Sequence, residues 1–146
     1  GTEITFHNYV NLGMAVGLDE GLLVPVVKGA DKMSLSEFVV ALKDLTERTF
    51  SKKLLPDEQA GSTFTISNLG MYAVDEFTAI INQPNVAILS VASTKEKVVP
   101  QNGELVVRPI MKISLTCDHR VIDGLTGARF MTDLKAAMED PLTIFI

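Results

Sequence analysis

The sequence predicts an α+β fold, a two-layer sandwich in which one mixed β-sheet carries amphipathic helices on one face. Three observations support this prediction: two stretches with apolar residues at helical spacing, several strand-like apolar runs, and a strong hairpin signal at residues 101–103. The 146 residues suit one domain and are enough to bury a core. No internal repeat, low-complexity stretch or linker interrupts them.

The first elements are predicted to form a hairpin at the rim of the sheet. Residues 9–17 alternate small or polar with apolar side chains, which indicates a strand with one buried face. Asp19, Glu20 and Gly21 supply a turn, and residues 22–27 form a continuous apolar run. Pro25 within that run places it at a sheet edge, because proline cannot donate to a strand ladder.

A helix is expected to follow, because Ser34 and Glu37 have the spacing of a capping box. Its apolar residues share one stripe, which is predicted to face the core: Leu35, Phe38, Val39, Leu42 and Leu45. Pro56 then breaks the pattern, and residues 63–67 form a β-branched alternating strand. Ser67 therefore lies at a strand end, where a hydroxyl can point into a cleft.

The second half of the chain is predicted to add the centre of the sheet and the last helix. Ile80 and Ile81 mark a buried stretch closed by a turn at residues 82–84, and residues 86–91 are apolar enough for a central strand. The hairpin at 101–103 joins two further strands. Asp123 is a good N-cap for a helix that ends near Glu139, with a stripe formed by Leu125, Ala128, Met131, Leu134 and Met138. The apolar tail, residues 142–146, is expected to be buried against a neighbouring subunit.

Composition excludes several classes of protein. The net charge of -5 and the pI near 5.0 argue against a nucleic-acid surface, which needs clustered Lys and Arg. No apolar run approaches the ~20 residues of a membrane span. The single cysteine, Cys117, excludes an internal disulfide and a cysteine-based zinc site, and is interpreted as a small buried strand residue. We expect no metal, no nucleic acid and no membrane.

The stretch around His119 is the strongest candidate for chemistry. An apolar strand pattern stops there, a short loop follows, and the last helix begins. A neutral imidazole on such a loop can accept a proton near pH 7, and Asp123, four residues on, can hold the loop or the ring. The alternative interpretation is an ordinary loop histidine between Asp118 and Arg120.

The string Asp-His-Arg-Val-Ile-Asp-Gly at 118–124 resembles the His-x-x-x-Asp-Gly signature of the dihydrolipoamide acyltransferases, core enzymes of the 2-oxo acid dehydrogenase complexes. Residues 21–26, 61–70 and 82–84 also resemble that family in order, so the likeness covers essentially the whole chain. It implies a chloramphenicol acetyltransferase-like fold and acyl transfer between a dihydrolipoyl thioester and coenzyme A. Residues 68–71 and 77–84 are most similar to the acetyltransferase of pyruvate dehydrogenase complexes; the succinyl and branched-chain types are the alternative.

The resemblance also implies roles for individual residues. His119 takes the proton from the attacking thiol, Ser67 donates a hydrogen bond to the negative oxygen of the tetrahedral intermediate, and Asp123 holds the loop. Coenzyme A, a substrate here, is expected to lie along a channel formed by Ser67, Asn68, Ala92 and Thr94. The lipoyl group arrives on a separate lipoyl domain.

The resemblance further implies assembly and location. It implies a homotrimer in which His119 and Ser67 meet across an interface, trimers assembled into a cage-like core, and decarboxylase and dihydrolipoamide dehydrogenase partners. The compartment would be the cytoplasm in a bacterium and the mitochondrial matrix in a eukaryote.

Family catalytic domains carry a further N-terminal segment, whose arginine is expected to pair with the motif aspartate. Residues 1–146 are therefore interpreted as the C-terminal part of the catalytic domain, without lipoyl and subunit-binding domains, and we expect activity to need the missing segment. Two other classes of protein are the alternatives. An antibiotic acetyltransferase of the same fold would need a chloramphenicol pocket, and a structural core protein would have no use for His119.

Overall fold

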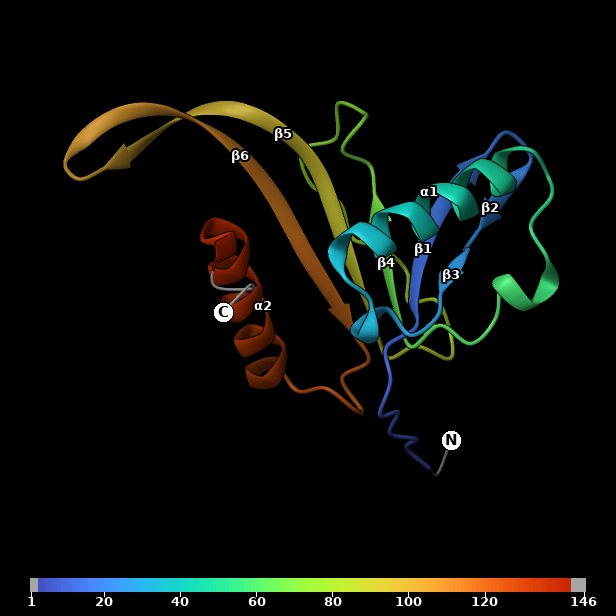
Figure 1. Ribbon diagram of the computed structural model, residues 1–146. Coiled ribbons are helices and arrows are strands. Elements are labelled where there is room, and N and C mark those ends of the chain that lie inside the picture. The colour runs from blue at the N-terminus through green and yellow to red at the C-terminus, as the bar shows by residue number, and fades with distance from the viewer. Residues whose placement is uncertain (1–2, 143–146) are drawn as a thin grey trace.

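The computed structural model describes residues 3–142, which are organised around one mixed sheet (Figure 1). The strand order is β2-β1-β4-β5-β6, with β3 also paired to β1. β4 runs parallel to both β1 and β5, and the other pairs are antiparallel. The elements are β1 Leu12–Leu18, β2 Gly21–Leu23, β3 Val26–Val27, α1 Leu35–Phe50, β4 Phe64–Asn68, β5 Ala87–Gln101, β6 Glu104–Cys117 and α2 Gly124–Glu139, with 3₁₀ turns at Ala30–Lys32 and Pro56–Glu58. The predicted α+β class is confirmed.

The first hairpin lies at the rim of the sheet, as predicted, with β2 outermost. Its first strand begins at Leu12 and not at residue 9, because the Val10 amide donates to the Asp31 carboxylate instead of to a strand. The predicted apolar run is divided into β2 and β3 on either side of Pro25. The carbonyl of Pro25 still accepts a hydrogen bond from the Met14 amide, so the chain stays attached to β1.

Helix α1 begins where the capping box predicted, with Ser34 and Glu37 bonded reciprocally. The predicted core stripe is buried only at its C-terminal end. Leu45 is buried and Phe38 and Leu42 are half-buried, whereas Leu35 and Val39 are 64% and 54% exposed. Helical periodicity shows which residues share a face, but it does not show how much of that face another element covers.

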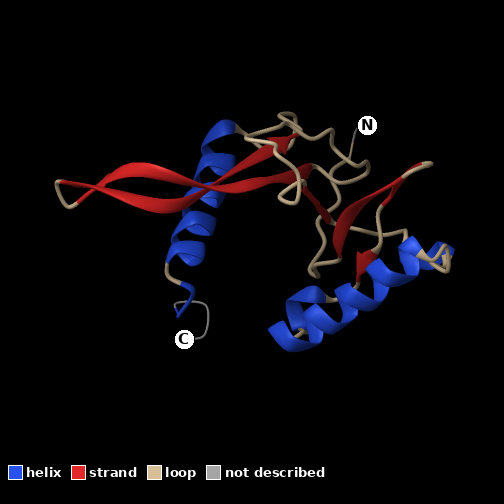
Figure 2. Cartoon of the chain, turned by 90° about the horizontal axis from the view of Figure 1, so that it is seen from above, coloured by secondary structure: helices blue, strands red, loops and turns tan. Residues whose placement is uncertain are grey.

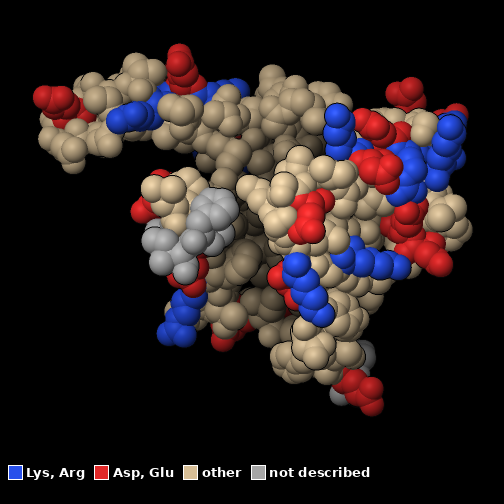
Figure 3. Space-filling model, viewed as in Figure 1, with Lys and Arg blue, Asp and Glu red and all other residues tan. Residues whose placement is uncertain are grey.

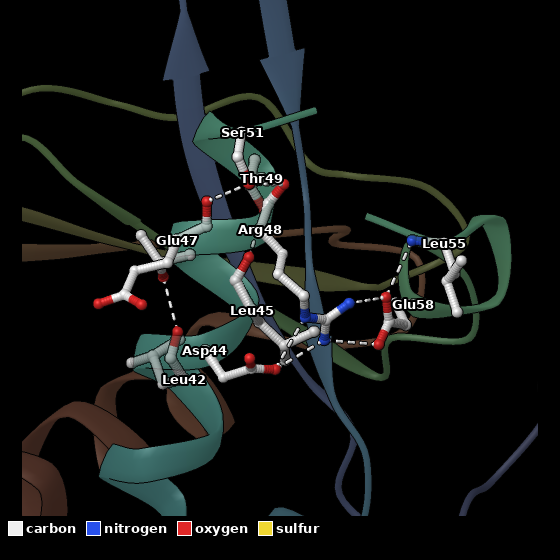
Figure 4. A network of polar contacts seen from close by, with 10 residues as sticks. Leu42, Asp44, Leu45, Glu47, Arg48, Thr49, Ser51, Leu55 and Glu58 are labelled. Atoms are coloured by element: carbon white, nitrogen blue, oxygen red, sulfur yellow. Dashed lines mark hydrogen bonds and ion pairs between the residues drawn. The ribbon is translucent and has the colours of Figure 1, made fainter. Parts of the chain in front are cut away.

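A polar network ties the end of α1 to the following turn (Figure 4). The guanidinium of Arg48 forms two parallel bonds with the Glu58 carboxylate, at 2.5 and 2.7 Å, and a third with Asp44. These bonds hold the pKa of Glu58 at about 2. Lys52, just beyond, pairs with Glu20 of the first turn. Charges of both signs are accordingly interspersed over this part of the surface (Figure 3).

The longest strands, β5 and β6, form a hairpin arm that projects beyond the rest of the sheet (Figure 2). Its turn is the predicted one: Asn102 and Gly103 both have positive φ, at 53° and 86°, which matches the twist of the strands. A bulge between Val91 and Thr94 marks where the arm leaves the sheet.

Helix α2 lies against one face of β6. A Cβ placed on Gly127 would be 3.8 Å from both Cys117 and Leu115, and Phe130 packs its ring against Phe64 of β4. The predicted stripe of α2 is nevertheless not buried: among the described residues none of this helix is fully covered. A groove of about 1120 Å³ separates its second half from β6.

The opposite face of the sheet is covered by the irregular segment 71–85. The Ala79 amide donates to the Ser90 hydroxyl, and the Ser114 hydroxyl donates to the Phe77 carbonyl. The prediction of a buried stretch at Ile80 is wrong, since this side chain is 92% exposed. The segment is held to the sheet by polar bonds near Ile80, while that side chain itself points outward.

Two further expectations concern the surface. The last four residues of the apolar tail lie outside the described residues, so its predicted burial is not tested. Within residues 3–142, no helix combines the length and the apolar character needed to cross a membrane.

Candidate active site

The loop that carries His119 is short and is held by several backbone hydrogen bonds. At its start, the Asp118 amide donates to the Val86 carbonyl at 2.8 Å, which attaches the loop to the residue before β5. The Asp118 carbonyl then accepts from the amides of Val121 and Ile122 at 2.9 and 3.0 Å. His119 is exposed, and its ring makes no hydrogen bond to any described residue. The imidazole is therefore available to a substrate.

Asp123 ends the loop by capping α2, as its sequence position predicted. Its carboxylate accepts the Thr126 amide at 2.7 Å. That backbone bond lowers the pKa of Asp123, and the nearby His119 adds a smaller contribution in the same direction. An ionised carboxylate that is already bonded to a helix end holds the loop in place and is poorly suited to relaying protons.

A cavity of about 350 Å³ opens beside His119, between the end of β6 and the first turns of α2. Its lining is mostly apolar and includes Cys117, Ile122, Gly127 and Ala128. Burial raises the pKa of the Cys117 thiol, so this group is protonated and poorly nucleophilic at neutral pH. His119 is then the group in this cavity that can act as a base near pH 7.

Ser67 belongs to a row of three serines that crosses the sheet. It pairs in register with Ser90 of β5, which pairs in turn with Ser114 of β6. The hydroxyls of Ser90 and Ser114 are bonded to the covering segment, at Ala79 and Phe77. The Ser67 hydroxyl has no hydrogen-bond partner among the described residues. Of the three hydroxyls, only that of Ser67 forms no hydrogen bond to a described residue.

Of the other predicted coenzyme A residues, Asn68 and Ala92 lie near Ser67, and Thr94 lies four residues beyond Ser90, the strand partner of Ser67. Asn68 ends β4 beside Val91, and its side chain accepts the Gly70 amide at 2.8 Å in a tight turn. A Cβ on Gly70 would meet Asn68 Oδ1 at 2.9 Å and the Ala92 carbonyl at 3.4 Å. Thr94 follows on the exposed side of the bulge. Asn68 and Gly70 thus end β4 in a turn, as residues of these types commonly do.

The structure does not bring Ser67 and His119 together within one chain. Ser67 is in register with Ser114, which lies two strands away in the sheet. Ser114 itself is three residues before Cys117, the end of β6. Standard sheet spacings put the Cα atoms of Ser67 and Cys117 roughly 14 Å apart, with His119 further on. Side chains alternate between faces, so Ser67 also leaves the sheet on the face opposite to Cys117.

The donor set for a metal is also absent from the described part of the chain. Residues 3–142 contain no group of three His, Cys, Asp or Glu side chains placed to hold an ion. The cavity beside His119 thus combines an imidazole with mostly apolar walls, and the Ser67 hydroxyl lies elsewhere on the sheet.

Comparison with known proteins places the chain among acyltransferases. Residues 1–146 match the family described as 2-oxoacid dehydrogenases acyltransferase (catalytic domain). The chain is 45% identical to the acetyltransferase component of the mitochondrial pyruvate dehydrogenase complex of Schizosaccharomyces pombe, over all of this chain and 31% of that protein. It is 41% identical to a succinyltransferase component of the 2-oxoglutarate dehydrogenase complex from Bartonella vinsonii, over 97% of this chain and 34% of that protein.

Solved structures agree with this placement. The dihydrolipoamide acetyltransferase of Azotobacter vinelandii superposes with a TM-score of 0.95 at 38% identity, over the whole of this chain and 60% of that one. The cubic core of a pyruvate dehydrogenase multienzyme complex gives a TM-score of 0.92 at 38% identity, over 96% of this chain and 58% of that one. The chain spans about a third of the length of the two relatives compared by sequence. The chain therefore belongs to the 2-oxoacid dehydrogenase acyltransferase family and has the fold of its catalytic domain.

Proposed function

We propose that residues 1–146 form the C-terminal part of an acyltransferase catalytic domain that moves an acetyl group between a dihydrolipoyl thioester and coenzyme A. Two polar side chains that form no hydrogen bond to any residue of the described part of the chain carry the proposal. They are the exposed imidazole of His119, on a loop bonded to the sheet, and the Ser67 hydroxyl at a strand end. A thiol with an ordinary pKa of ~8.5 is mostly protonated at neutral pH, so thioester exchange needs a base.

The reaction follows from these two groups. The imidazole of His119 takes the proton of the attacking thiol, and the thiolate adds to the thioester carbonyl carbon. The carbonyl oxygen becomes negative in the tetrahedral intermediate, where the Ser67 hydroxyl donates to it. Collapse of the intermediate breaks the original carbon–sulfur bond, and the leaving thiolate recovers the proton from His119. Protons and electron pairs balance in each step.

Spacing in the relative from A. vinelandii supports these roles. The roles studied in that enzyme are those of a serine, a histidine 52 positions later and an asparagine four positions beyond it. Ser67, His119 and Asp123 have the same two separations. An asparagine at the last position has no charge, which favours a loop-holding role for Asp123 over a proton relay.

Because Ser67 and His119 lie far apart within one chain, we propose that one copy supplies the base and a neighbouring copy the hydroxyl. A homotrimer that assembles into a larger cage-like core satisfies this requirement, and one solved relative is the cubic core of a pyruvate dehydrogenase complex. The lipoyl domain, the decarboxylase and dihydrolipoamide dehydrogenase are the partners that such a core would serve.

Acetyl is the proposed acyl group, because the relative from S. pombe and the enzyme from A. vinelandii are acetyltransferases. The specific competitor is succinyl transfer, since a succinyltransferase component is 41% identical. An assay of the full-length protein with a dihydrolipoamide acceptor distinguishes acetyl transfer from succinyl transfer. It compares the rates with acetyl, succinyl and isobutyryl donors.

The same assay tests the base. His119→Ala should lower turnover by about two powers of ten or more, which is the usual loss for a general base, while leaving assembly intact. His7→Ala is the matched control, because His7 is the other histidine of the sequence, is exposed and lies outside residues 118–123. His119→Ala activity within a few-fold of the parent would exclude His119 as the base.

A further inference from the structure

The residues before and after His119, Asp118 and Arg120, form an ion pair with each other. Arg120 Nη2 donates to Asp118 Oδ2 at 2.6 Å, and Arg120 Nε donates to Asp118 Oδ1 at 2.9 Å. The same carboxylate accepts the backbone amide of Arg120 at 3.0 Å. The three residues 118–120 therefore form a closed loop of bonds with His119 at its tip.

Asp118 is also the residue through which the loop is attached to the sheet. Its amide bonds to Val86, and its carbonyl accepts the amides of Val121 and Ile122. The His119 side chain forms no hydrogen bond to another residue within 3–142 that could set its direction. The direction in which its side chain leaves the backbone is thus determined by Asp118 on one side and Arg120 on the other.

The pair is poorly placed to stabilise the fold. The Arg120 side chain is 77% exposed, and an ion pair with so exposed a partner contributes little to the free energy of unfolding. It joins residues two apart, so it brings no distant elements together. A catalytic base, in contrast, is sensitive to small displacements, because proton transfer requires hydrogen-bond reach and alignment.

We propose that the Asp118–Arg120 pair is a positioning device for His119, which holds the imidazole in the orientation that meets the attacking thiol. The proposal rests on the proposed function of His119 as the base. Asp123 fixes the other end of the loop at the helix, so that the histidine is held from both directions.

The test uses two single variants of the full-length protein and their combination. Arg120→Ala removes the guanidinium but keeps the bond from the residue 120 amide to Asp118. Asp118→Asn keeps an oxygen for that amide but removes the charge that attracts the guanidinium. Each should lower kcat about tenfold, with KM for coenzyme A within twofold of the parent and an unchanged Tm. The double variant should be no worse than either single one, because both remove the same device.

Arg129→Ala is the matched control, since Arg129 is an exposed arginine on α2 outside the loop. Arg120→Lys should recover only part of kcat, because an ammonium cannot form two parallel bonds to a carboxylate. NMR of the His119 imidazole protons provides a readout that does not need activity. The resonance should move towards a motionally averaged position in both single variants and stay in place in the control.

The results distinguish a failure of the proposed acyl transfer from a failure of the positioning role of Asp118 and Arg120. Parent protein without acyl transfer would overturn the proposed function, and the imidazole resonance would still decide whether the pair orients His119. An active parent with unaffected kcat in both variants would overturn the positioning role. A raised KM in Arg120→Ala alone would also overturn it, by showing that Arg120 contacts the substrate. Additive losses in the double variant would show two separate roles in place of one device.

Discussion

The row of serines across the sheet allows function and stability to be separated residue by residue. Ser67→Ala removes a hydroxyl that bonds nothing among the described residues, so the free energy of unfolding should change by no more than about 0.5 kcal/mol. Turnover should fall about 100-fold or more, because the lost bond of roughly 3 kcal/mol forms only in the tetrahedral intermediate. Apparent affinity should change little.

Ser90→Ala is the reverse case. Ser90 is 1% exposed and its hydroxyl accepts the Ala79 amide at 3.1 Å, so the substitution leaves that amide without its partner. The expected cost is about 1 kcal/mol, near the lower end for an unsatisfied group because Ala79 is partly exposed. For a domain of this size that lowers Tm by about 3 °C. Turnover should stay within several-fold of the parent.

Calorimetry and the thiol-acceptor assay, run on both variants in the full-length protein, give the comparison. The reasoning fails if Ser67→Ala loses stability while Ser90→Ala does not, since the hydroxyl of Ser67 would then have a structural partner. It also fails if Ser67→Ala changes only KM, which would make Ser67 a binding contact and not a stabiliser of the intermediate.

Two further substitutions test the packing and the polar network of the fold. Because Arg48 holds the pKa of Glu58 at about 2, below its ordinary 4.5, the pair stabilises the fold fully above pH 4.5, and this contribution is lost as the pH falls towards 2. The Tm of Glu58→Gln should therefore lie below that of the parent at neutral pH and approach it in acid; a constant difference would contradict the assignment. Gly13→Ala should cost about 1 to 3 kcal/mol in denaturant unfolding, because its Cβ would lie 2.9 Å from Val24 Cγ1. Gly17→Ala on the same strand has nothing within 4 Å and is the control, so equal losses would refute the steric argument.

Sequence patterns predicted helix caps and turns correctly, because these features depend on residues close together in the chain. The capping box at Ser34, the cap at Asp123 and the turn at Asn102 and Gly103 all lie where they were predicted. Each depends on bonds or dihedral angles within four residues, which the sequence states directly. The loop position of His119 follows from the same kind of information.

Burial was less predictable, because it depends on what another element covers. Leu35, Val39 and Ile80 have apolar side chains in good patterns, yet all three are more than half exposed. Periodicity alone also could not show that Ser90 and Ser114 hold the covering segment while Ser67 stays free. That distinction needs the register of three strands and the path of residues 71–85.

The sequence by itself determined the α+β class, the family resemblance and the candidates His119, Asp123 and Ser67, because these depend on residue types at fixed spacings along the chain. Only the tertiary structure decided that the Ser67 hydroxyl has no hydrogen-bond partner among the described residues, and that Ser67 lies two strands away from the strand that leads into the His119 loop. Strand order and register are set by long-range pairing, and no spacing along the chain records which residues that pairing brings side by side.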